Sequence, residues 1–204
     1  MLRLILARHG RTSWNVQGRV QGGGGLDETG RAQVTALARR LASEPITAIY
    51  ASPAWRARQT AQPLADALGL RVRRRRLLRD LDYGRYAGAL VADVMREAPD
   101  LFHRWRTEPE TVTFDGGENL AALRGRIERF IRDMEAAHPE GTVFAATHDS
   151  PVRMAVSIAH GLPDSSHREE WIKTSYASLT VLEVEDDIVR AVCHNDSAHL
   201  AGIE

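Results

Sequence analysis

Two histidines of this sequence each follow directly on a short apolar run. His9 lies in Arg8-His9-Gly10 after residues 2–7, and His148 follows residues 142–147. Apolar runs of this length predict buried strands, and open α/β sheets bind their ligands beyond the carboxyl ends of the strands. The two imidazoles are therefore expected to converge on one crevice, where a neutral imidazole nitrogen can act as a nucleophile.

Two arginines accompany the histidines. Arg8 is adjacent to His9, and Arg56 follows a further apolar run, residues 48–51, which Ser52-Pro53 closes. Guanidinium groups have a donor geometry that suits phosphate oxygens. The sequence therefore predicts an anion site. The alternatives are a surface salt bridge for each arginine and a structural hydrogen-bonding role for a histidine in a glycine-rich loop.

Strands and helices alternate around these residues. Strands are predicted at 2–7, 48–51, 70–72 and 142–147, with a hairpin of 179–184 and 188–193 around Asp186-Asp187. Helices are predicted at 27–41 with Asp27 as N-cap, 54–68 with Pro63 kinking or splitting it, 91–98, 101–106, 119–137, and from Pro151 toward Gly161. This order predicts an α/β fold, a three-layer α/β/α sandwich with a largely parallel central sheet, as a single domain over residues 1–204.

The composition limits the classes of partner. Lys+Arg and Asp+Glu both number 27, so no net charge steers the chain toward nucleic acid or an acidic membrane. The basic stretch 71–76 lacks interleaved aromatic residues and predicts a solvated edge strand. The apolar runs are far shorter than the ~20 residues that cross a bilayer. The single cysteine, Cys193, and the absence of a signal-peptide pattern at Met1 predict a cytoplasmic location.

A series of segments resembles the histidine phosphatase, or phosphoglycerate mutase-like, superfamily. An Arg-His-Gly tripeptide alone would be weak evidence, but here the order and intervals match over nearly the whole chain. The segments are Leu6-Ala7-Arg8-His9-Gly10-Arg11-Thr12-Ser13-Trp14-Asn15, Arg19-Val20-Gln21-Gly22, Ser52-Pro53-Ala54-Trp55-Arg56-Ala57-Arg58-Gln59-Thr60-Ala61, Leu78-Arg79-Asp80-Leu81-Asp82-Tyr83-Gly84, Gly116-Gly117-Glu118 and Thr147-His148.

The resemblance implies a fold and a set of roles. His9 would take the phosphoryl group covalently, and the phosphoryl oxygens would be bound by Arg8, Arg56 and His148, with Asn15, Gln21 and Gly22 completing the pocket. Phosphoryl transfer needs mainly positioning and charge neutralisation. Two arginines and a protonated His148 would supply these without a divalent ion, so neither a metal nor another cofactor is expected. His194 and His199 have no further ligand pair that would suggest zinc.

The resemblance also places a carboxylate, commonly glutamate, in the segment 78–84. Asp80 stands at that position and is predicted to be the general acid that protonates the leaving alkoxide and later activates water. Asp82 is the alternative, and a loop-capping role is open for either aspartate.

The sequence departs from the family pattern in three places, the last two of which concern substrate contacts. Arg11 replaces the usual Glu, Tyr86-Ala87-Gly88 stands where Trp-Glu-Gly is common, and Asp149-Ser150 replaces a glycine pair. Residues 84–115 are predicted to form a lid or a substrate-specificity region, with Trp105 lining the pocket.

The expected activity is hydrolysis of a small-molecule phosphomonoester. A cofactor-dependent phosphoglycerate mutase is an alternative, although residues 84–116 lack the extended basic insertion that such mutases need. A non-catalytic anion-binding domain on the same fold is a further alternative. A homodimer is possible, because dimers are common among such enzymes.

Overall fold

The computed structural model describes residues 1–20 and 23–203. Within them, one sheet has the strand order β3-β2-β4-β1-β5-β6. The strands are β1 (Leu2–Arg8), β2 (Ile46–Ala51), β3 (Val72–Arg74), β4 (Gly141–Thr147), β5 (Leu179–Glu185) and β6 (Ile188–Asp196). The helices are α1 (Ser13–Val16), α2 (Glu28–Leu41), α3 (Trp55–Leu68), α4 (Val91–Glu97), α5 (Pro99–Thr107), α6 (Leu120–Ala137) and α7 (Asp149–Ala159).

The sheet is largely parallel, as predicted. β1 pairs in parallel with β4, β4 with β2, and β2 with β3, whereas β5 runs antiparallel to β1. In the register of β1 and β4, Arg8 lies opposite Thr147. The two strands therefore end level with each other, and the residues that follow them, His9 and His148, emerge side by side.

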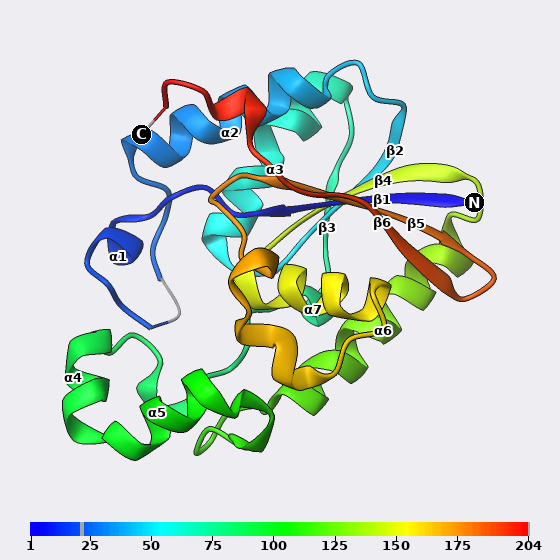
Figure 1. Cartoon of the computed structure of the whole chain (residues 1–204). Coiled ribbons are helices and arrows are strands. Elements are labelled where there is room, and N and C mark those ends of the chain that lie inside the picture. The colour runs from blue at the N-terminus through cyan, green and yellow to red at the C-terminus, as the bar shows by residue number, and fades with distance from the viewer. Residues whose placement is uncertain (21–22, 204) are drawn as a thin grey trace.

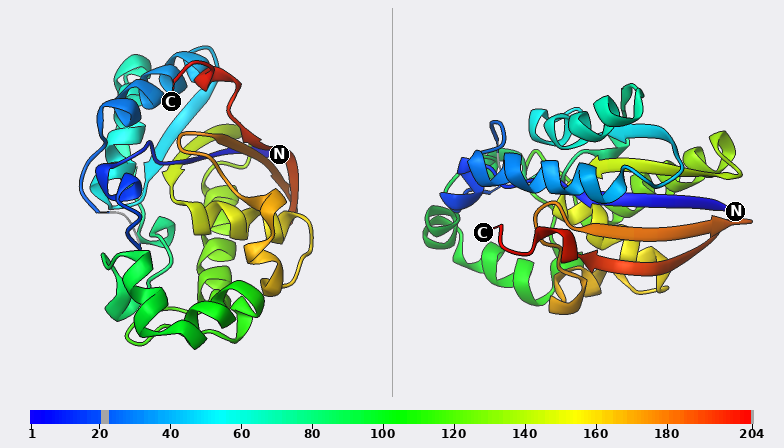
Figure 2. Two further views of the ribbon diagram at one scale, coloured as in Figure 1. Left: turned by 60° about the vertical axis from the view of Figure 1, so that its left-hand side comes forward. Right: turned by 90° about the horizontal axis from the view of Figure 1, so that it is seen from above.

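Helices cover both faces of the sheet (Figure 1). Leu37 of α2 and Leu64 of α3 join a core cluster with Ile5 and Phe144 on one face. On the other face, the apolar side of α6 packs in a second cluster with strand residues such as Leu4. The views in Figure 2 show the same three layers, which confirms the predicted α/β/α sandwich.

Local sequence signals explain most of the element boundaries. Asp27 Oδ1 accepts a hydrogen bond from Gly30 N at 2.7 Å, which confirms the predicted N-cap of α2. The β5–β6 hairpin turns at Asp186 and Asp187, whose φ angles of 53° and 61° suit the two central positions of a tight hairpin turn. Residues 72–74, within the basic stretch, form β3, which is a sheet edge as predicted.

Two predicted helix boundaries differ from the structure. The sequence predicts that Pro63 kinks or splits its helix, and the split is wrong because α3 runs without a break from Trp55 to Leu68. Apolar residues on both sides of Pro63, including Ala61 and Leu64, are buried against the sheet, and this packing holds the helix together despite the missing amide donor. Helix α7 begins at Asp149, two residues before Pro151.

The middle region forms α4 and α5, which stand apart from the sheet (Figure 1). Val20 N donates to Ala89 O at 2.9 Å, and Gly88 N donates back to Val20 O at 3.0 Å. The buried side chains of this region join the cluster that α6 forms with the sheet. The middle region is therefore fixed both to the loop after β1 and to the core. No helix within residues 1–20 and 23–203 is long and apolar enough to span a membrane.

Candidate active site

His9 and His148 converge at the carboxyl ends of β1 and β4. His9 N donates to Thr147 O at 2.9 Å, and the two ring centroids lie 5.2 Å apart with the planes inclined at 68°. Both side chains are nearly inaccessible, with exposures of 3% and 1%. The predicted convergence of the two histidines is thus confirmed.

The His9 ring is held in one tautomer. Its Nδ1 lies 2.8 Å from Gly10 O, and because a carbonyl only accepts, Nδ1 must carry the proton. Burial and the charges of Arg56 and Arg8 lower the pKa of His9 well below its ordinary value. The ring is therefore neutral, and its Nε2 lone pair is available to attack an electrophile.

The environment of His148 differs from the sequence-based expectation. Arg56 Nη2 donates to His148 Nδ1 at 3.0 Å, so the ring donates through Nε2 to Ser52 Oγ at 2.8 Å. Burial, followed by the charge of Arg56, lowers the pKa of His148 well below its usual range. The expectation of a protonated His148 is therefore wrong for this structure, because a guanidinium already occupies its Nδ1. The positive charge of the site resides on the arginines.

Arg8 is held from several sides. Its Nη1 donates to Thr174 O and lies 3.5 Å from Asp149 Oδ1, while its guanidinium carbon lies 4.0 Å from the centre of the Tyr176 ring. These contacts orient the guanidinium beside His9.

Arg56 lies in the first turn of α3, and its exposure is 6%. Burial lowers the pKa of Arg56, the charge of Asp80 opposes this, and the charge of Arg8 lowers the pKa further. The Nε atoms of both arginines are buried without a hydrogen-bond partner among the residues that the structure describes. Two neighbouring cations with unused buried donors form a site for an anion.

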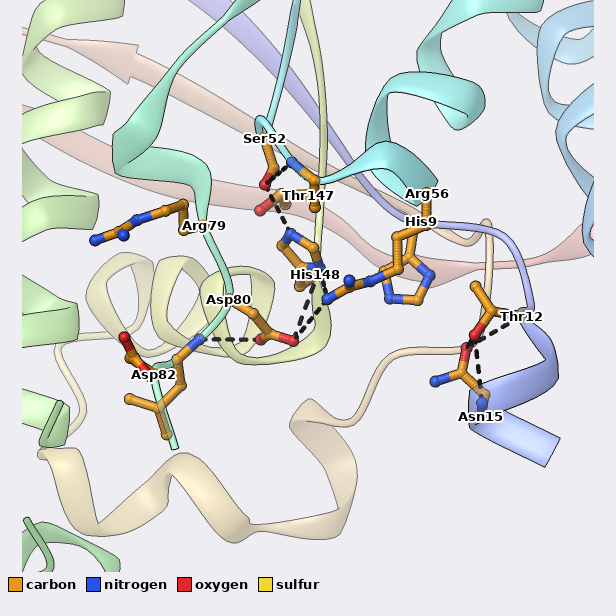
Figure 3. Close-up of polar contacts among 12 residues, drawn as sticks. His9, Thr12, Asn15, Ser52, Arg56, Arg79, Asp80, Asp82, Thr147 and His148 are labelled. Carbon is orange, nitrogen blue, oxygen red and sulfur yellow. Dashed lines mark hydrogen bonds and ion pairs between the residues drawn. The ribbon is translucent and has the colours of Figure 1, made fainter. Parts of the chain in front are cut away.

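Asp80 faces this cationic pair. Its Oδ2 lies 3.5 Å from Arg56 Nη2 and 3.7 Å from His148 Nδ1 (Figure 3). Burial raises the pKa of Asp80 to about 6, the charge of Arg56 opposes this rise, and Asp149 adds to it. A carboxyl group with this pKa is present in both protonation states near neutral pH, as acid–base catalysis requires.

Asp82 has a different position. Its Oδ1 accepts from Gly84 N at 3.0 Å, which is the loop-capping role that the sequence left open. Figure 3 shows Asp82 turned away from the two histidines. Of the two aspartates, the geometry brings Asp80 to the site.

The loop of Asp80 is braced by α6. Arg126 donates to the carbonyl oxygens of Leu77, Arg79 and Asp80 at 2.7, 2.7 and 2.9 Å. It also binds Glu118 through two nitrogens, with Nε to Oε1 at 2.8 Å and Nη2 to Oε2 at 2.9 Å. Glu118 is the acidic residue of the Gly-Gly-Glu segment, so this motif fixes the loop on which Asp80 is carried.

The Gly-Gly-Glu segment has no room for a side chain at position 117. A Cβ at Gly117 would lie 2.3 Å from Asp82 O and 2.6 Å from Gly84 N. The backbone of the Gly-Gly-Glu segment therefore packs directly on the backbone of the Asp80 loop.

The remaining predicted pocket residues lie after β1. Asn15 Oδ1 accepts from Thr12 N at 3.1 Å and from Thr12 Oγ1 at 2.8 Å, which leaves its amide nitrogen as a donor. Figure 3 shows Asn15 beyond His9, on the side away from Asp80. The other two predicted residues, Gln21 and Gly22, lie outside the described part of the chain.

The amino-acid sequence matches a known family model. Residues 4–197 match the model described as the histidine phosphatase superfamily (branch 1). The chain belongs to the histidine phosphatase superfamily. It is 38% identical to Phosphoserine phosphatase 1 of Hydrogenobacter thermophilus, over 91% of this chain and 88% of that protein.

Other comparisons agree with this assignment. The chain is 34% identical to glucosyl-3-phosphoglycerate phosphatase of Mycobacterium tuberculosis over 78% of this chain and 70% of that one. The solved structure of Bacillus stearothermophilus YhfR has a TM-score of 0.92 at 25% identity and covers 98% of this chain and 100% of its own. The predicted phosphoglycerate mutase-like fold is thereby confirmed.

Several residues of this histidine phosphatase were not found from the sequence. Ser52 fixes His148, Thr60 Oγ1 accepts from Gly10 N at 3.1 Å, and Tyr176 stacks on Arg8. Ser52 and Thr60 lie inside the matching segments, but only the three-dimensional contacts reveal what they hold. Tyr176 lies in a segment without any signal of its own.

Asp149, which replaces a glycine of the family pattern, has a structural role that the sequence does not indicate. Its Oδ1 accepts from Thr174 Oγ1 at 2.7 Å, and its Oδ2 accepts from Arg153 Nε at 2.8 Å. Because Arg8 lies 3.5 Å from the same Oδ1, Asp149 joins the start of α7 to the Arg8 guanidinium. This histidine phosphatase thus uses a carboxylate where a glycine is usual in the family pattern.

Proposed function

We propose that the chain hydrolyses a small-molecule phosphomonoester through a covalent phosphohistidine at His9, without a metal ion. One observation carries the proposal: the buried His9 ring has its proton fixed on Nδ1 and its Nε2 free, beside the guanidinium groups of Arg8 and Arg56. The names of the two relatives, a phosphoserine phosphatase and a glucosyl-3-phosphoglycerate phosphatase, support a phosphatase activity.

In the first step, His9 Nε2 attacks phosphorus and the ester P–O bond breaks. Arg8 and Arg56 neutralise the charge on the equatorial oxygens, the amide nitrogen of Asn15 adds a further donor, and His148 orients Arg56. The departing alkoxide takes the proton of Asp80, so the alcohol leaves neutral and Asp80 becomes a carboxylate.

In the second step, Asp80 acts in the opposite direction. Its carboxylate removes a proton from a water molecule as the water oxygen attacks phosphorus, the N–P bond breaks, and the electron pair returns to His9 Nε2. Inorganic phosphate is released, and Asp80 is again protonated. A pKa of about 6 suits a group that must give and take a proton in one turnover.

The metal-free mechanism follows from the charge of the site. Two guanidinium groups supply permanent positive charge where the phosphoryl oxygens would bind, so the chemistry needs no Lewis acid. In residues 1–20 and 23–203, no three His, Cys, Asp or Glu side chains gather in a way that could hold a metal ion.

A trapping experiment tests the proposal. Rapid acid-free quenching of the enzyme with a ³²P-labelled phosphomonoester should give an acid-labile, alkali-stable label, and His9→Ala should lose both the label and hydrolysis. His103→Ala, at an exposed histidine of α5, is the matched control and should keep both. Activity should persist in EDTA. Full hydrolysis by His9→Ala, or isomerisation without phosphate release by the wild type, would refute the proposal.

A further inference from the structure

A cavity lies between the middle region and the core. It has a volume of about 270 Å³, and its walls are mainly apolar or aromatic, among them Tyr83, Val91, Leu101, Trp105 and Phe114. Trp105 and Phe114 pack edge to face at 5.1 Å, and Tyr83 packs on Phe114 at 4.8 Å. Trp105, which is predicted from the sequence to line the substrate pocket, lies in the wall of this cavity. The cavity is close to the lower end of the usual range for small-molecule pockets, which suits one ring-sized group.

Tyr83 connects this cavity to the acid of the proposed mechanism. It lies three residues after Asp80, and the charge of Asp80 adds to the effect of burial in raising the pKa of Tyr83. The Tyr83 hydroxyl also lies beside Ser150, in the first turn of the helix that follows His148. Tyr83, a wall residue of this cavity, therefore lies close in the chain to Asp80 and beside the helix that follows His148.

Arg168 gives the cavity a charged rim. Its guanidinium carbon lies 5.6 Å from the centre of the Trp105 ring, and the residue is exposed to solvent. No hydrogen bond or ion pair joins the Arg168 side chain to any residue of the described chain. Arg153 and Arg106 add further positive charge nearby. Arg168 is thus a cation at a pocket mouth with free donors.

The charge of the lining also excludes one class of leaving group. Within the described residues, the cavity wall contains two arginines, Arg19 and Arg168, and no carboxylate. Arg19 already donates to Gln17 Oε1 and Gly88 O, so Arg168 is the cation with unused donors. An ammonium group, such as that of an amino acid, would meet positive charge and have no counter-ion here.

We propose that this cavity is the leaving-group subsite, and that it takes an aromatic or similarly flat apolar alcohol bearing a carboxylate, which Arg168 binds. The inference rests on the proposed function, because the alcohol must leave from a phosphoryl group held at His9. The aromatic wall would stack on the ring, and the guanidinium would take the carboxylate through two parallel hydrogen bonds.

Steady-state kinetics on a matched set of esters test the inference. The probes are phenyl phosphate, its 3- and 4-carboxy derivatives, O-phosphoserine and glycerol 2-phosphate. In the wild type, one carboxylated isomer should exceed phenyl phosphate in kcat/KM by about 10-fold or more, and O-phosphoserine should be the poorer substrate. Arg168→Gln should lower kcat/KM for that isomer by about 10- to 100-fold and change phenyl phosphate by less than about 3-fold.

Two further variants test whether changes in kcat/KM come from the cavity itself or from a general effect on the protein. Arg104→Gln removes an exposed arginine next to Trp105 that does not line the cavity, and it should leave all five probes unchanged. Val91→Phe should fill part of the cavity and lower kcat/KM for the aryl esters but not for glycerol 2-phosphate.

The outcomes distinguish the two proposals. Labelling of His9 with no preference for a carboxylated aryl ester, or an equal loss on all esters in Arg168→Gln, would overturn the subsite and leave the phosphohistidine mechanism standing. Absence of both hydrolysis and the His9 label would overturn the proposed function and the subsite together.

Discussion

The side chains of Arg56 and His148 are hydrogen-bonded to each other at the centre of the site, with Nη2 donating to Nδ1 over 3.0 Å. This contact makes His148 an acceptor at Nδ1 and keeps its ring neutral, so Arg56 supplies the charge and His148 supplies orientation. Ser52 holds the other nitrogen of the ring, and Asp80 lies against the same guanidinium. Arg56 is therefore the residue on which the geometry of the phosphate site depends most.

Replacement of Arg56 by lysine should be severe although the charge is kept. A lysine ammonium cannot donate to His148 and to a phosphoryl oxygen with the planar fork of a guanidinium. We expect kcat/KM to fall by about 100-fold or more in Arg56→Lys. Arg58→Lys, on the same helix but stacked on Trp55, should retain activity within about 3-fold. Similar kinetics for the two variants would contradict the assignment.

Leaving-group dependence should separate Asp80 from Asp82. Asp80→Asn should lower kcat/KM for alkyl phosphates by about 10²- to 10⁴-fold, because their alkoxides must be protonated on departure. The loss should be much smaller for p-nitrophenyl phosphate, whose leaving group is stable as an anion. Asp82→Asn changes a loop cap and should affect both esters little. If Asp82→Asn shows the selective loss instead, the assignment of the acid is reversed.

The pH dependence of kcat/KM should reflect the raised pKa of Asp80. The first step needs protonated Asp80, so the advantage of the wild type over Asp80→Asn on an alkyl phosphate should fall as pH rises through about 6. Using the ratio of the two kcat/KM profiles cancels the ionisation of the substrate itself. Because a bound phosphate adds negative charge near Asp80, the midpoint of kcat should lie above that of kcat/KM. A ratio that is constant from pH 5 to 8 would exclude Asp80 as the acid.

The framework of the site could be predicted from the sequence because strand ends leave a local signal. The apolar runs before His9 and His148 predict buried strands, and the carboxyl ends of parallel strands meet at one edge of a sheet. The apolar run 48–51 likewise placed Arg56 after a strand end, and the family resemblance then supplied Asp80, which no periodicity would identify. The choice between Asp80 and Asp82 needed the structure, because both aspartates lie in one loop and only their directions differ.

The hydrogen-bond partners of the site residues left no such signal. The acceptor that fixes the His9 tautomer is a carbonyl, and every residue has one. Protonation of His148 was misjudged because its charge state depends on Arg56, 92 residues away, pointing at Nδ1. Arg126 looked like one more polar position on an amphipathic helix, yet it binds the loop of the proposed acid.

Replacement of Arg126 should lower both the stability of the protein and the rate of proton transfer by Asp80. Arg126→Met breaks the pair with Glu118 and leaves three loop carbonyls without their donor, so we expect a loss of about 2–4 kcal/mol in the free energy of unfolding. Activity on alkyl phosphates should fall about 10-fold, and less on p-nitrophenyl phosphate, because Asp80 is displaced while His9 is not. Arg129→Met, an exposed position on the same helix, is the control. Equal effects on both esters would show that the brace acts on the site as a whole.

Asp80 should also lower the stability of the protein in its active pH range. Its pKa is raised from 3.8 to about 6 by folding, so the folded state binds the proton more tightly than the unfolded chain. The contribution of the Asp80 proton to the free energy of unfolding is therefore fully present below pH about 4. It declines as pH rises through 6 and is absent above that. The shift corresponds to at most about 3 kcal/mol.

The neutral variant Asp80→Asn removes this penalty while keeping an oxygen that can accept from Leu81 N. Urea unfolding should show Asp80→Asn equal to the wild type at pH 4 and more stable than it by up to about 3 kcal/mol at pH 7.5. Asp82→Asn, whose carboxylate caps a loop, should show no such gain. A gain that is the same at both pH values would mean that packing, and not the buried charge, is responsible. A gain confined to the higher pH would show that the raised pKa of the proposed acid is maintained at the expense of folding stability.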